Sequence, residues 1–264
     1  MRPLTALDQR EAAELSGLLF DLDDTLLDHG KLSEQAYSSL FRLREAGLEL
    51  YIVTGRPAGW AEVLTRMFPV HGAVSENGAI FVVPSDGDGR LLDPLSQAER
   101  ATRRARLAEL VALMRKAMPD LVPASDVDAR RSDFTFDIGE TRKLEADRVA
   151  EARALAELHG ASTLVSSVHL HVTFDRADKA AGAVALLARL RRYDASAALS
   201  RYAFIGDSEN DAACFAAFRT SIGVANLRGR PTVAPRYLTS SPRGAGFAEA
   251  ARLLIERRNG RAEP

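Results

Sequence analysis

Two aspartates near the start of the chain, Asp21 and Asp23, follow the apolar run Leu18-Leu19-Phe20 with a single leucine between them. Such an apolar run predicts a buried strand, and the carboxyl end of a strand is where ligands bind in open parallel sheets. Carboxylates two residues apart on a strand share one face, and like charges this close repel unless a cation or a proton intervenes. The pair therefore indicates half of a metal site, with a candidate nucleophile in it.

Three further polar segments follow a predicted strand or open a predicted helix. Thr54-Gly55-Arg56 comes directly after the apolar run Leu48–Val53, and its hydroxyl and its glycine suit a phosphate oxygen. Asp178-Lys179 opens a helix, where the ammonium and the helix N-terminus together favour an anion. The segment Gly206–Asp211 follows the apolar run Tyr202–Ile205 and brings more carboxylates to the same sheet edge.

These carboxylates have no histidine or cysteine among them, so they predict an all-oxygen metal site. Mg²⁺ is the natural cation there, because it binds through one or two carboxylates together with substrate phosphate and water. A cation beside a phosphate-binding loop indicates phosphoryl transfer. Each segment alone also fits a turn, a helix cap or a solvated lysine. We favour the combined site, since four such coincidences in one consistent order are rare.

Apolar runs alternate with helical patterns in the first third of the chain and again after residue 177. A strand, a helix and another strand in this order imply right-handed crossovers and a parallel sheet. We therefore expect an α/β fold whose core is a three-layer, Rossmann-like parallel sheet. The expected strands are Gly17–Phe20, Leu48–Val53, His71–Ser75, Tyr202–Ile205 and Ser221–Val224, and the expected helices are Ser33–Ala46, Pro57–Pro69, Lys179–Arg192, one that begins near Glu209, and Phe247–Arg257.

The middle of the chain has a different pattern, which predicts a second domain inserted into the first. The turn-rich segment Pro84–Gly89 separates two apolar runs and predicts a hairpin. Strands with one apolar face beyond it suggest an antiparallel sheet that helices cover on one side only. We expect a catalytic core in residues 1–83 and 177–264, and an α/β cap in residues 84–176. The helices expected in the cap are Ser96–Met118 and Lys143–His159, and its strands are Asp133–Ile138 and Val168–Phe174.

Composition restricts the partners that the protein is expected to have. The chain of 264 residues carries 35 basic and 36 acidic residues, a formal net charge of -1, so no charged surface for nucleic acid or anionic lipid is predicted. Its single cysteine, Cys214, excludes an internal disulfide. Neither a secretory signal nor a membrane span is visible. We expect a soluble cytoplasmic protein, a monomer or a homodimer, whose partner is a small phosphorylated metabolite.

The four segments, in this order, resemble the motifs of the haloacid dehalogenase-like hydrolase superfamily. The large insertion between the second and third motifs resembles the Cof-type class, in which an α/β cap follows the third core strand. The segment Ser75-Glu76-Asn77-Gly78-Ala79 matches the loop that follows that strand in this class. The resemblance covers both the core and the insertion, and it implies a Mg²⁺-dependent hydrolase of phosphoric monoesters.

The resemblance also implies a role for each motif residue. Asp21 would be the nucleophile that forms an aspartyl-phosphate, and Asp23 would protonate the leaving oxygen and then activate water. Mg²⁺ would be held by Asp21, Asp207 and the backbone carbonyl of Asp23, while Asp211 supports the site from nearby. The residues that would bind the phosphoryl group or the substrate are Thr54, Gly55, Arg56, Asn77, Lys179 and Asn210.

Some positions depart from the pattern of the family. Asp24 and Ser208 stand where glycine is frequent, and Cys214 stands where methionine is frequent, but none of these changes removes a proposed ligand. The segment Lys179-Ala180-Ala181-Gly182 is more unusual, because the family usually has glycine directly after this lysine. The departure concerns the local backbone and not the charge.

Alternation along the two expected cap strands places polar side chains together on one face of each strand. If the apolar faces pack on the cap helices, the polar faces point the other way. The resemblance to the Cof-type class implies that this direction is toward the core, where the polar residues could recognise the non-phosphate part of the substrate. Hydroxyl-binding side chains favour a sugar or glycosyl phosphate. A polar sheet surface that faces solvent is an equally good interpretation. The polar residues are His169, His171 and Thr173 on one strand, and Asp133, Thr135 and Asp137 on the other.

The histidine-bearing strand and the glycine-rich segment Pro242–Phe247 also resemble the mannosyl-3-phosphoglycerate and sucrose-phosphate phosphatase branch. Arg56 could reach a substrate anion or form an outward salt bridge, and the arginines from Arg100 to Arg106 are expected to form a solvated helix face. The leading hypothesis is a phosphatase of a small phosphorylated metabolite. The alternatives are a sugar phosphomutase and a non-catalytic protein that binds phosphometabolites.

Overall fold

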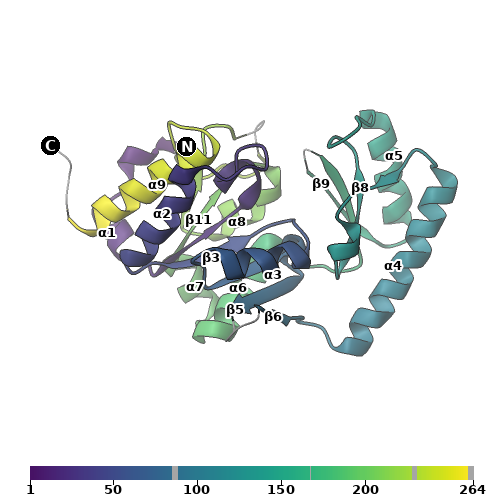
Figure 1. The fold of residues 1–264 in the computed structure, drawn as a ribbon, viewed down its shortest axis with the longest axis horizontal. Coiled ribbons are helices and arrows are strands. Elements are labelled where there is room, and N and C mark those ends of the chain that lie inside the picture. Colours follow the sequence, from purple (N-terminus) through teal and green to yellow (C-terminus); the bar gives the residue numbers. More distant parts are fainter. Residues whose placement is uncertain (85–88, 167, 228–230, 261–264) are drawn as a thin grey trace.

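The structure is a computed structural model that describes residues 1–84, 89–166, 168–227 and 231–260. Its strands form two separate sheets, which Figure 1 shows side by side. The strands are β1 (Arg2–Pro3), β2 (Gly17–Phe20), β3 (Glu49–Val53), β4 (Gly72–Ser75), β5 (Ile80–Pro84), β6 (Gly89–Leu92), β7 (Val122–Pro123), β8 (Asp133–Asp137), β9 (Ser162–Val165), β10 (His169–Thr173), β11 (Tyr202–Gly206), β12 (Thr220–Gly223) and β13 (Tyr237–Leu238).

The α-helices of the described residues connect these strands. None of them is both long enough and apolar enough to cross a bilayer. They are α1 (Gln9–Ala13), α2 (Glu34–Glu45), α3 (Ala58–Met67), α4 (Gln97–Ala117), α5 (Ala146–Leu158), α6 (Lys179–Arg191), α7 (Ala195–Arg201), α8 (Ala212–Ala217) and α9 (Arg243–Arg258).

The large sheet has nine strands in the order β1-β13-β12-β11-β2-β3-β4-β5-β6. All neighbours from β1 to β4 pair in parallel, whereas β5 pairs antiparallel with both β4 and β6. In the centre of the sheet, Phe20 of β2 lies in register with Ile205 of β11 and Ile52 of β3. The carboxyl ends of these strands therefore lie next to one another, and so do the polar segments that follow them.

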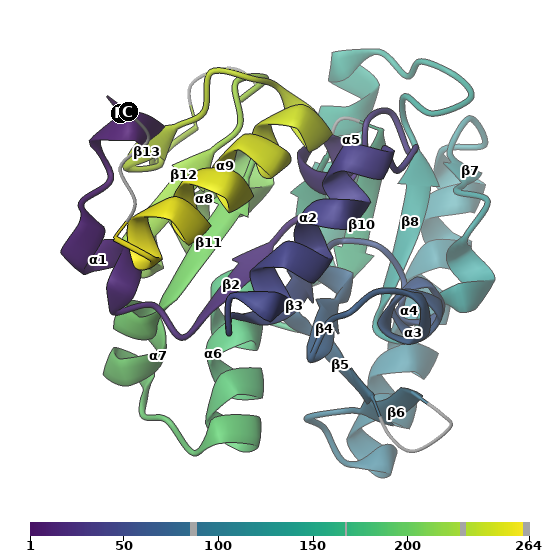
Figure 2. The ribbon, with the colours of Figure 1, turned by 60° about the vertical axis from the view of Figure 1, so that its left-hand side comes forward.

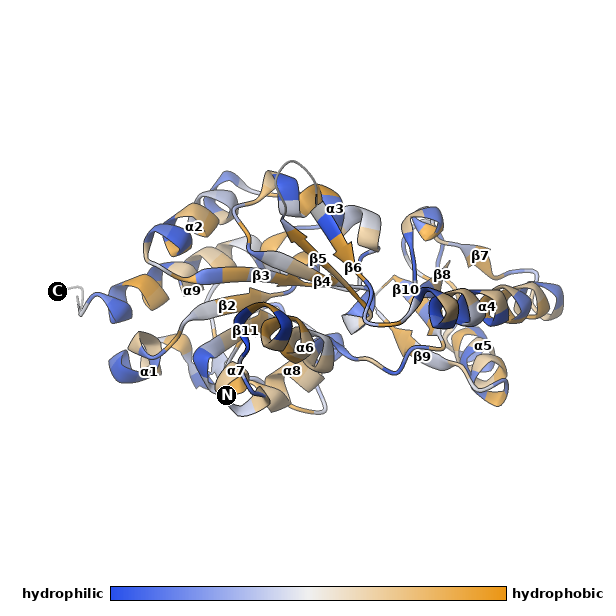
Figure 3. Cartoon of the chain, turned by 90° about the horizontal axis from the view of Figure 1, so that it is seen from below, coloured by the Kyte–Doolittle hydropathy of each residue, from blue (hydrophilic) through white to orange (hydrophobic). Residues whose placement is uncertain are grey.

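Helices cover both faces of the large sheet, which makes the core three layers thick (Figure 2). Alternate residues of β2 face opposite ways. Leu18 and Phe20 pack in a cluster with residues of α1, α2, α3 and α9, while Leu19 packs with residues of α6, α7 and α8. The strands that lie between the helices are accordingly the most apolar elements of the core (Figure 3). The predicted α/β, Rossmann-like fold class is confirmed.

The second sheet is antiparallel, with the order β7-β8-β10-β9, and α4 and α5 cover one of its faces. Phe136, Leu170 and Val172 are fully buried against these helices, as the alternation of apolar residues predicted. The predicted domain boundary at residue 84 falls inside a hairpin of the large sheet, since β6 pairs with β5. The change from one sheet to the other therefore comes after Leu92. The turn predicted between β5 and β6 lies mostly outside the described residues.

The arginines at the start of α4 form the predicted solvated face only in part: Arg104 and Arg106 are exposed, whereas Arg100 is buried. Arg100 is 9% exposed, and its guanidinium pairs with Asp93 at 2.6 Å and with Asp175 at 2.8 Å. Arg103 also reaches Asp175, at 2.8 Å. Asp93 and Asp175 lie on the two chain segments that join the sheets, so Arg100 ties both connections to α4. The sequence pattern could not show this, because the two carboxylates are far apart along the chain.

Replacing this arginine is expected to lower stability. Arg100→Ala removes the guanidinium that joins Asp93 to Asp175 and leaves the Asp93 carboxylate without its partner, which costs about 3 kcal/mol of unfolding free energy. Chemical denaturation followed by circular dichroism measures the loss. Arg115→Ala, on the exposed face of the same helix, is the matched control and should change stability by less than about 0.5 kcal/mol. Equal effects of the two substitutions would show that Arg100 does not hold the connections together.

Candidate active site

A lysine and three buried carboxylates meet at the carboxyl edge of the large sheet. Lys179, the first residue of α6, places its Nζ 2.7 Å from Asp21 Oδ1 and 2.7 Å from Asp211 Oδ1. Asp21, Asp207 and Asp211 each offer an oxygen within 4.8 Å of the others, and we call these three residues the acidic cluster. All three are at most 6% exposed. The structure thus brings together the first, third and fourth predicted motifs.

Asp211 is fixed by the loop in which it lies. Its Oδ2 accepts hydrogen bonds from the backbone N–H groups of Asp207 at 2.9 Å and Ser208 at 3.2 Å. A Cβ atom on Gly206 would lie 2.4 Å from the same oxygen, so only glycine allows the carboxylate to fold back over the end of β11. Ser208 has a negative φ of -145° and caps this turn, which explains why glycine is not required there.

Asp207 is held by groups from two other segments. Thr25 Oγ1 lies 3.4 Å from Asp207 Oδ1, and the Nδ2 of Asn226 lies 3.3 Å from Asp207 Oδ2. The same Nδ2 donates to the backbone carbonyl of Asp24 at 2.9 Å. Asn226 was not predicted, because a single asparagine after a strand carries no recognisable signal. Its side chain connects Asp207 of the fourth motif with Asp24 of the first.

The turn after Asp23 explains a departure from the family pattern. Asp24 has φ 57° and ψ 11°, in the left-handed region that favours glycine. Aspartate is among the few other residues that tolerate this conformation. The carboxylate of Asp24 also pairs with the Arg243 side chain at 3.3 Å. Aspartate therefore replaces glycine here without a change in the turn.

The electrostatics of the acidic cluster favour a cation in addition to Lys179. Burial raises the pKa of Asp21 well above its ordinary value; the Lys179 ammonium opposes this shift, and Asp211, Asp207 and Asp23 add to it. Burial also disfavours the ammonium, yet Asp21 and Asp211 keep the pKa of Lys179 above its usual range. One ammonium cannot neutralise three carboxylates, and all the donor atoms are oxygens. The residues therefore fit Mg²⁺.

The second motif forms a tight loop beside the third-strand loop. Thr54 is fully buried, and its Oγ1 accepts a hydrogen bond from the backbone N–H of Arg56 at 3.1 Å. Asn77, in the 3-10 helix η3 (Glu76–Gly78), donates its backbone N–H to the Thr54 carbonyl at 3.1 Å. A Cβ on Gly55 would lie 3.0 Å from Asn77 Oδ1, which is buried and has no hydrogen-bond partner among the described residues. The amide of Asn77 thus has unused hydrogen-bonding capacity.

A contact between two glycines places Lys179 and accounts for the unusual sequence after it. A Cβ on Gly182 would lie 2.5 Å from the Cα of Gly78, so the first turn of α6 touches η3 directly. Gly78 has φ 110° and lies against the backbone of Asp178, where a Cβ would be 2.1 Å from the carbonyl oxygen. The close approach occurs at Gly182 and not directly after the lysine, so Ala180 is accommodated.

Filling this contact should impair both stability and activity. Gly182→Ala forces α6 away from η3 and moves Lys179, and overpacking of this kind costs about 1–3 kcal/mol. We expect a lower melting temperature together with a loss of the phosphoryl-transfer activity that the motifs predict. Ala181→Ser, at the exposed neighbouring position, is the matched control and should leave both unchanged. A fully active and stable Gly182→Ala variant would contradict this role of the contact.

Arg56 does not point outward but pairs with Asp23. Its Nε donates to Asp23 Oδ2 at 2.8 Å, and its Nη2 donates to Oδ1 at 2.7 Å. The guanidinium also lies over the ring of Trp60, 4.5 Å from the centroid. Arg56 was predicted to reach a substrate anion or to form an outward salt bridge. It does form a salt bridge, but the partner is Asp23, another motif residue.

Most of the predicted polar residues of the second sheet are buried, so they do not form the solvent-facing surface that was one interpretation. His171 Nδ1 lies 2.8 Å from Asp133 Oδ2, and Asp133 also pairs with Arg130 at 3.0 Å. Arg130 Nη1 donates to the carbonyl of Gly55 at 3.1 Å, which links this face to the second motif. His169 Nε2 lies 3.0 Å from Glu140 Oε2.

A second link between the sheets runs through Glu76. Its carboxylate accepts the backbone N–H groups of Arg131 at 2.8 Å and Ser132 at 2.6 Å, and that of Ala58 at 3.0 Å. The third-strand loop therefore docks the chain that leads into β8. Asn210, also predicted, lies half-buried beside Asp211 in the short helix Glu209–Asp211, and makes no side-chain hydrogen bond with the other described site residues.

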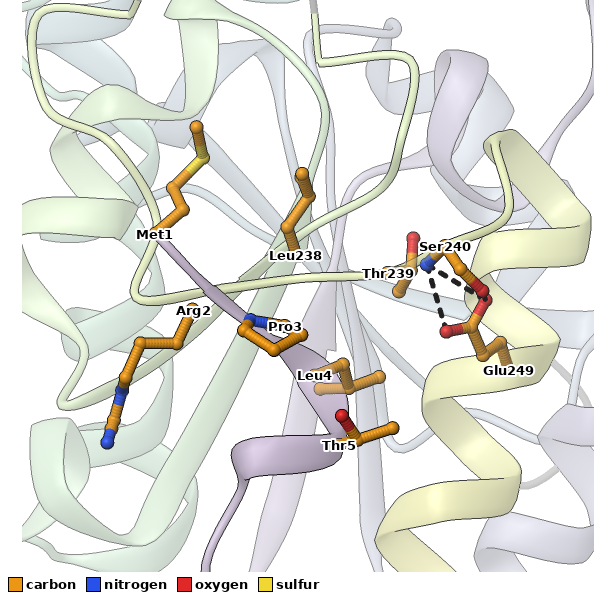
Figure 4. Close-up of a pocket in the computed structure, with 9 residues that line it drawn as sticks. All are labelled: Met1, Arg2, Pro3, Leu4, Thr5, Leu238, Thr239, Ser240 and Glu249. Atoms are coloured by element: carbon orange, nitrogen blue, oxygen red, sulfur yellow. Dashed lines mark hydrogen bonds between the residues drawn. The ribbon is translucent and has the colours of Figure 1, made fainter.

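A cavity of about 410 Å³ lies elsewhere, between the start of the chain and the segment Leu238–Ser240 (Figure 4). Its charged side chains already have partners: Glu249 accepts hydrogen bonds from the N–H and hydroxyl of Ser240, and Arg2 donates to the hydroxyl of Tyr237 at 2.8 Å. No residue of the acidic cluster lines it. The chemistry of the chain is therefore assigned to the sheet edge and not to this cavity.

The chain is similar to a known family of hydrolases and to several phosphatases. A family model described as haloacid dehalogenase-like hydrolase matches residues 18–100. A phosphoglycolate phosphatase of Archaeoglobus fulgidus is 30% identical over 240 residues, which cover 89% of this chain and 94% of that protein. A phosphoglycolate phosphatase of Methanothermobacter thermautotrophicus is 26% identical over 243 residues, which cover 91% and 99%.

Solved structures share the fold. A Thermoplasma acidophilum protein superposes with a TM-score of 0.72 at 18% identity, covering 91% of this chain and 98% of that chain. The sucrose-phosphatase of Synechocystis, in complex with sucrose and phosphate, has a TM-score of 0.62 at 16% identity, with coverages of 91% and 98%. The chain belongs to the haloacid dehalogenase-like hydrolase family. Within it, the predicted phosphoric monoester hydrolase is confirmed.

Proposed function

We propose that the protein is a Mg²⁺-dependent phosphatase that works through an aspartyl-phosphate on Asp21. The observation that carries the proposal is the placement of Asp21, with Lys179 Nζ 2.7 Å from its Oδ1 and Asp207 within the acidic cluster. A carboxylate can attack an anionic phosphate only where positive charge reduces the repulsion between them. Lys179 supplies part of that charge, and Mg²⁺ held by Asp21, Asp207 and the Asp23 carbonyl would supply the rest.

In this proposal Asp21 forms and breaks the bond to phosphorus, and Asp23 transfers the proton. An oxygen of Asp21 forms a bond to phosphorus, while the bond from phosphorus to the leaving oxygen breaks and Asp23 donates its proton to that oxygen. In the second half, the Asp23 carboxylate takes a proton from water, whose oxygen attacks the phosphorus and releases inorganic phosphate and Asp21. Thr54 and Asn77 lie on neighbouring loops that would orient the phosphoryl group, and Asp211 holds Lys179 in place.

We propose that the second sheet, with α4 and α5, is the cap that selects the substrate. Three links favour this: Arg130 reaches Gly55, Glu76 binds Ser132, and α3 contacts η4 (Val127–Ala129), since a Cβ on Gly59 would lie 3.1 Å from the Ala129 Cβ. The names of the relatives make 2-phosphoglycolate the first substrate to test. A sugar or glycosyl phosphate, predicted from the polar cap strands, is the second class.

Phosphate release from a panel of phosphorylated metabolites, with Mg²⁺ and purified protein, tests the proposal. The panel includes 2-phosphoglycolate, several sugar phosphates and p-nitrophenyl phosphate. Release in the absence of a bisphosphate activator distinguishes a phosphatase from a sugar phosphomutase. If nothing in the panel is hydrolysed, the chain is better explained as a non-catalytic protein that binds phosphometabolites.

A further inference from the structure

Arg56 forms a salt bridge with Asp23, the residue that transfers the proton in the proposed function. Its Nε and Nη2 bind both oxygens of Asp23, at 2.8 and 2.7 Å, so each oxygen already accepts a charge-assisted hydrogen bond. A carboxyl group that protonates a leaving oxygen needs one of its oxygens to carry a proton and to face the substrate. Asp23 must therefore release at least one contact with Arg56 during each turnover.

Arg56 has two contacts that do not involve Asp23. Its backbone N–H donates to Thr54 Oγ1 at 3.1 Å, and its guanidinium lies over the ring of Trp60, so the residue is held at its backbone and at its charged group. The Arg56 side chain is 19% exposed, whereas that of Asp23 is 43% exposed. When the pair separates, the guanidinium stays at the site and loses its anionic partner.

The neighbouring cations are already neutralised. Lys179 pairs with Asp21 and Asp211, and Arg130 is bound by Asp126 at 3.1 Å and by Asp133 at 3.0 Å. Among the described residues, the Nη1 nitrogen of Arg56 has no hydrogen-bond partner. A guanidinium separated from Asp23 therefore needs another planar anion, and a carboxylate matches its fork of N–H groups.

We propose that Arg56 is a specificity-determining residue, which binds a carboxylate of the substrate near the phosphate ester in exchange for Asp23. The inference rests on the proposed function and deepens it, since it couples recognition of the substrate to the release of the proton donor. A substrate without a second anion leaves Asp23 paired with Arg56 for most of the time. It is therefore turned over less efficiently, even though its phosphate binds at the same loops.

A matched pair of substrates tests the exchange in the full-length protein. 2-Phosphoglycolate and ethyl phosphate have the same two-carbon skeleton, and only the first carries a carboxylate. We expect kcat/KM of the wild type to favour 2-phosphoglycolate by about tenfold or more, as one charge-assisted pair allows. In Arg56→Gln this ratio should fall by about tenfold or more, toward one, because kcat/KM for 2-phosphoglycolate falls much further than kcat/KM for ethyl phosphate. Arg56→Lys, which keeps the charge without the fork, should lie between the two.

Arg66→Gln, on the exposed part of α3, is the control and should leave the ratio unchanged. A wild type without preference between the two substrates overturns the inference, and so does an equal loss of kcat/KM for both in Arg56→Gln and Arg56→Lys. In either case, hydrolysis of p-nitrophenyl phosphate by the wild type shows that the proposed phosphatase function still stands. If the wild type hydrolyses none of these esters with Mg²⁺, both proposals fail.

Discussion

Asp21→Asn is expected to reduce Mg²⁺-dependent phosphate release by at least about 10³-fold, because it removes the oxygen nucleophile and leaves an amide of the same shape. The loss should appear in kcat for every substrate, including p-nitrophenyl phosphate, since the attack on phosphorus is common to all of them. Steady-state release of inorganic phosphate measures it. A phosphorylated intermediate, trapped by acid quench after mixing with labelled substrate, should also disappear in this variant.

The fold should survive the substitution. Lys179 retains Asp211 at 2.7 Å when Asp21 is changed, so the ammonium is not left unpaired. The pKa of Asp21 is raised in the folded protein, chiefly by burial. Its ionised form therefore costs stability above the pKa of the unfolded chain, and that cost grows as the pH rises; the amide removes it. We expect the melting temperature of metal-free Asp21→Asn at neutral pH to equal or exceed that of the wild type.

Asp28→Asn is the matched control, because its side chain is 56% exposed and lies only a few residues further on. It should retain the full rate. Residual turnover in Asp21→Asn that is insensitive to Mg²⁺ would point to a contaminating phosphatase, whereas turnover close to the wild-type rate would refute the assignment of the nucleophile.

The parts of the site that the sequence predicted are those in which a short segment carries its own signal. Asp21, Thr54, Lys179 and Asp207 each follow a strand or open a helix, and parallel strands must end at one edge of the sheet. Their convergence therefore follows from the order of the elements. The role of Gly206 is local in the same way, since the Asp211 carboxylate that folds back over it belongs to the same loop.

Contacts between segments that are distant along the chain could not be predicted in the same way. Glu76 and Ser132 are 56 residues apart, and Asn226 reaches Asp24 across 202 residues. Nothing in the local sequence of either partner specifies the other. The pairing of Arg56 with Asp23 was missed for the same reason, although both residues were predicted to belong to the site.

Elements with a weak pattern were also missed. β9 has half-exposed residues on both faces, so it lacks the alternation that identifies a strand. α7 is a seven-residue helix with one fully buried side chain, Ala198, and its sequence looks like a polar connection. The hairpin of β5 and β6 was predicted, but the sequence does not say which sheet it joins. The pairing of β5 with β4 shows that the hairpin belongs to the large sheet, so the change to the second sheet comes after Leu92.

Removal of divalent metal is expected to abolish turnover, and addition of Mg²⁺ to restore it. Without a cation, three carboxylates share one ammonium at the acidic cluster, and the phosphate of a substrate would add further negative charge. Dialysis against EDTA, followed by titration with Mg²⁺ while phosphate release is recorded, measures the effect. Ca²⁺ should restore far less, because it prefers more ligands at longer distances than this compact cluster offers.

A substitution of Asp207 tests whether this residue is a ligand of the metal. Asp207→Asn should shift the Mg²⁺ concentration that gives half-maximal activity upward by about tenfold or more, since one charged ligand is lost. Glu209→Gln is the matched control, because this exposed carboxylate binds the hydroxyl and N–H of Thr232 at 2.6 Å and belongs to no proposed metal site. Thermal unfolding gives an independent readout: Mg²⁺ should raise the melting temperature of the wild type and of Glu209→Gln, but barely that of Asp207→Asn. Full activity of the wild type in EDTA would mean that Lys179 alone supplies the positive charge, and the metal would then have no part in the reaction.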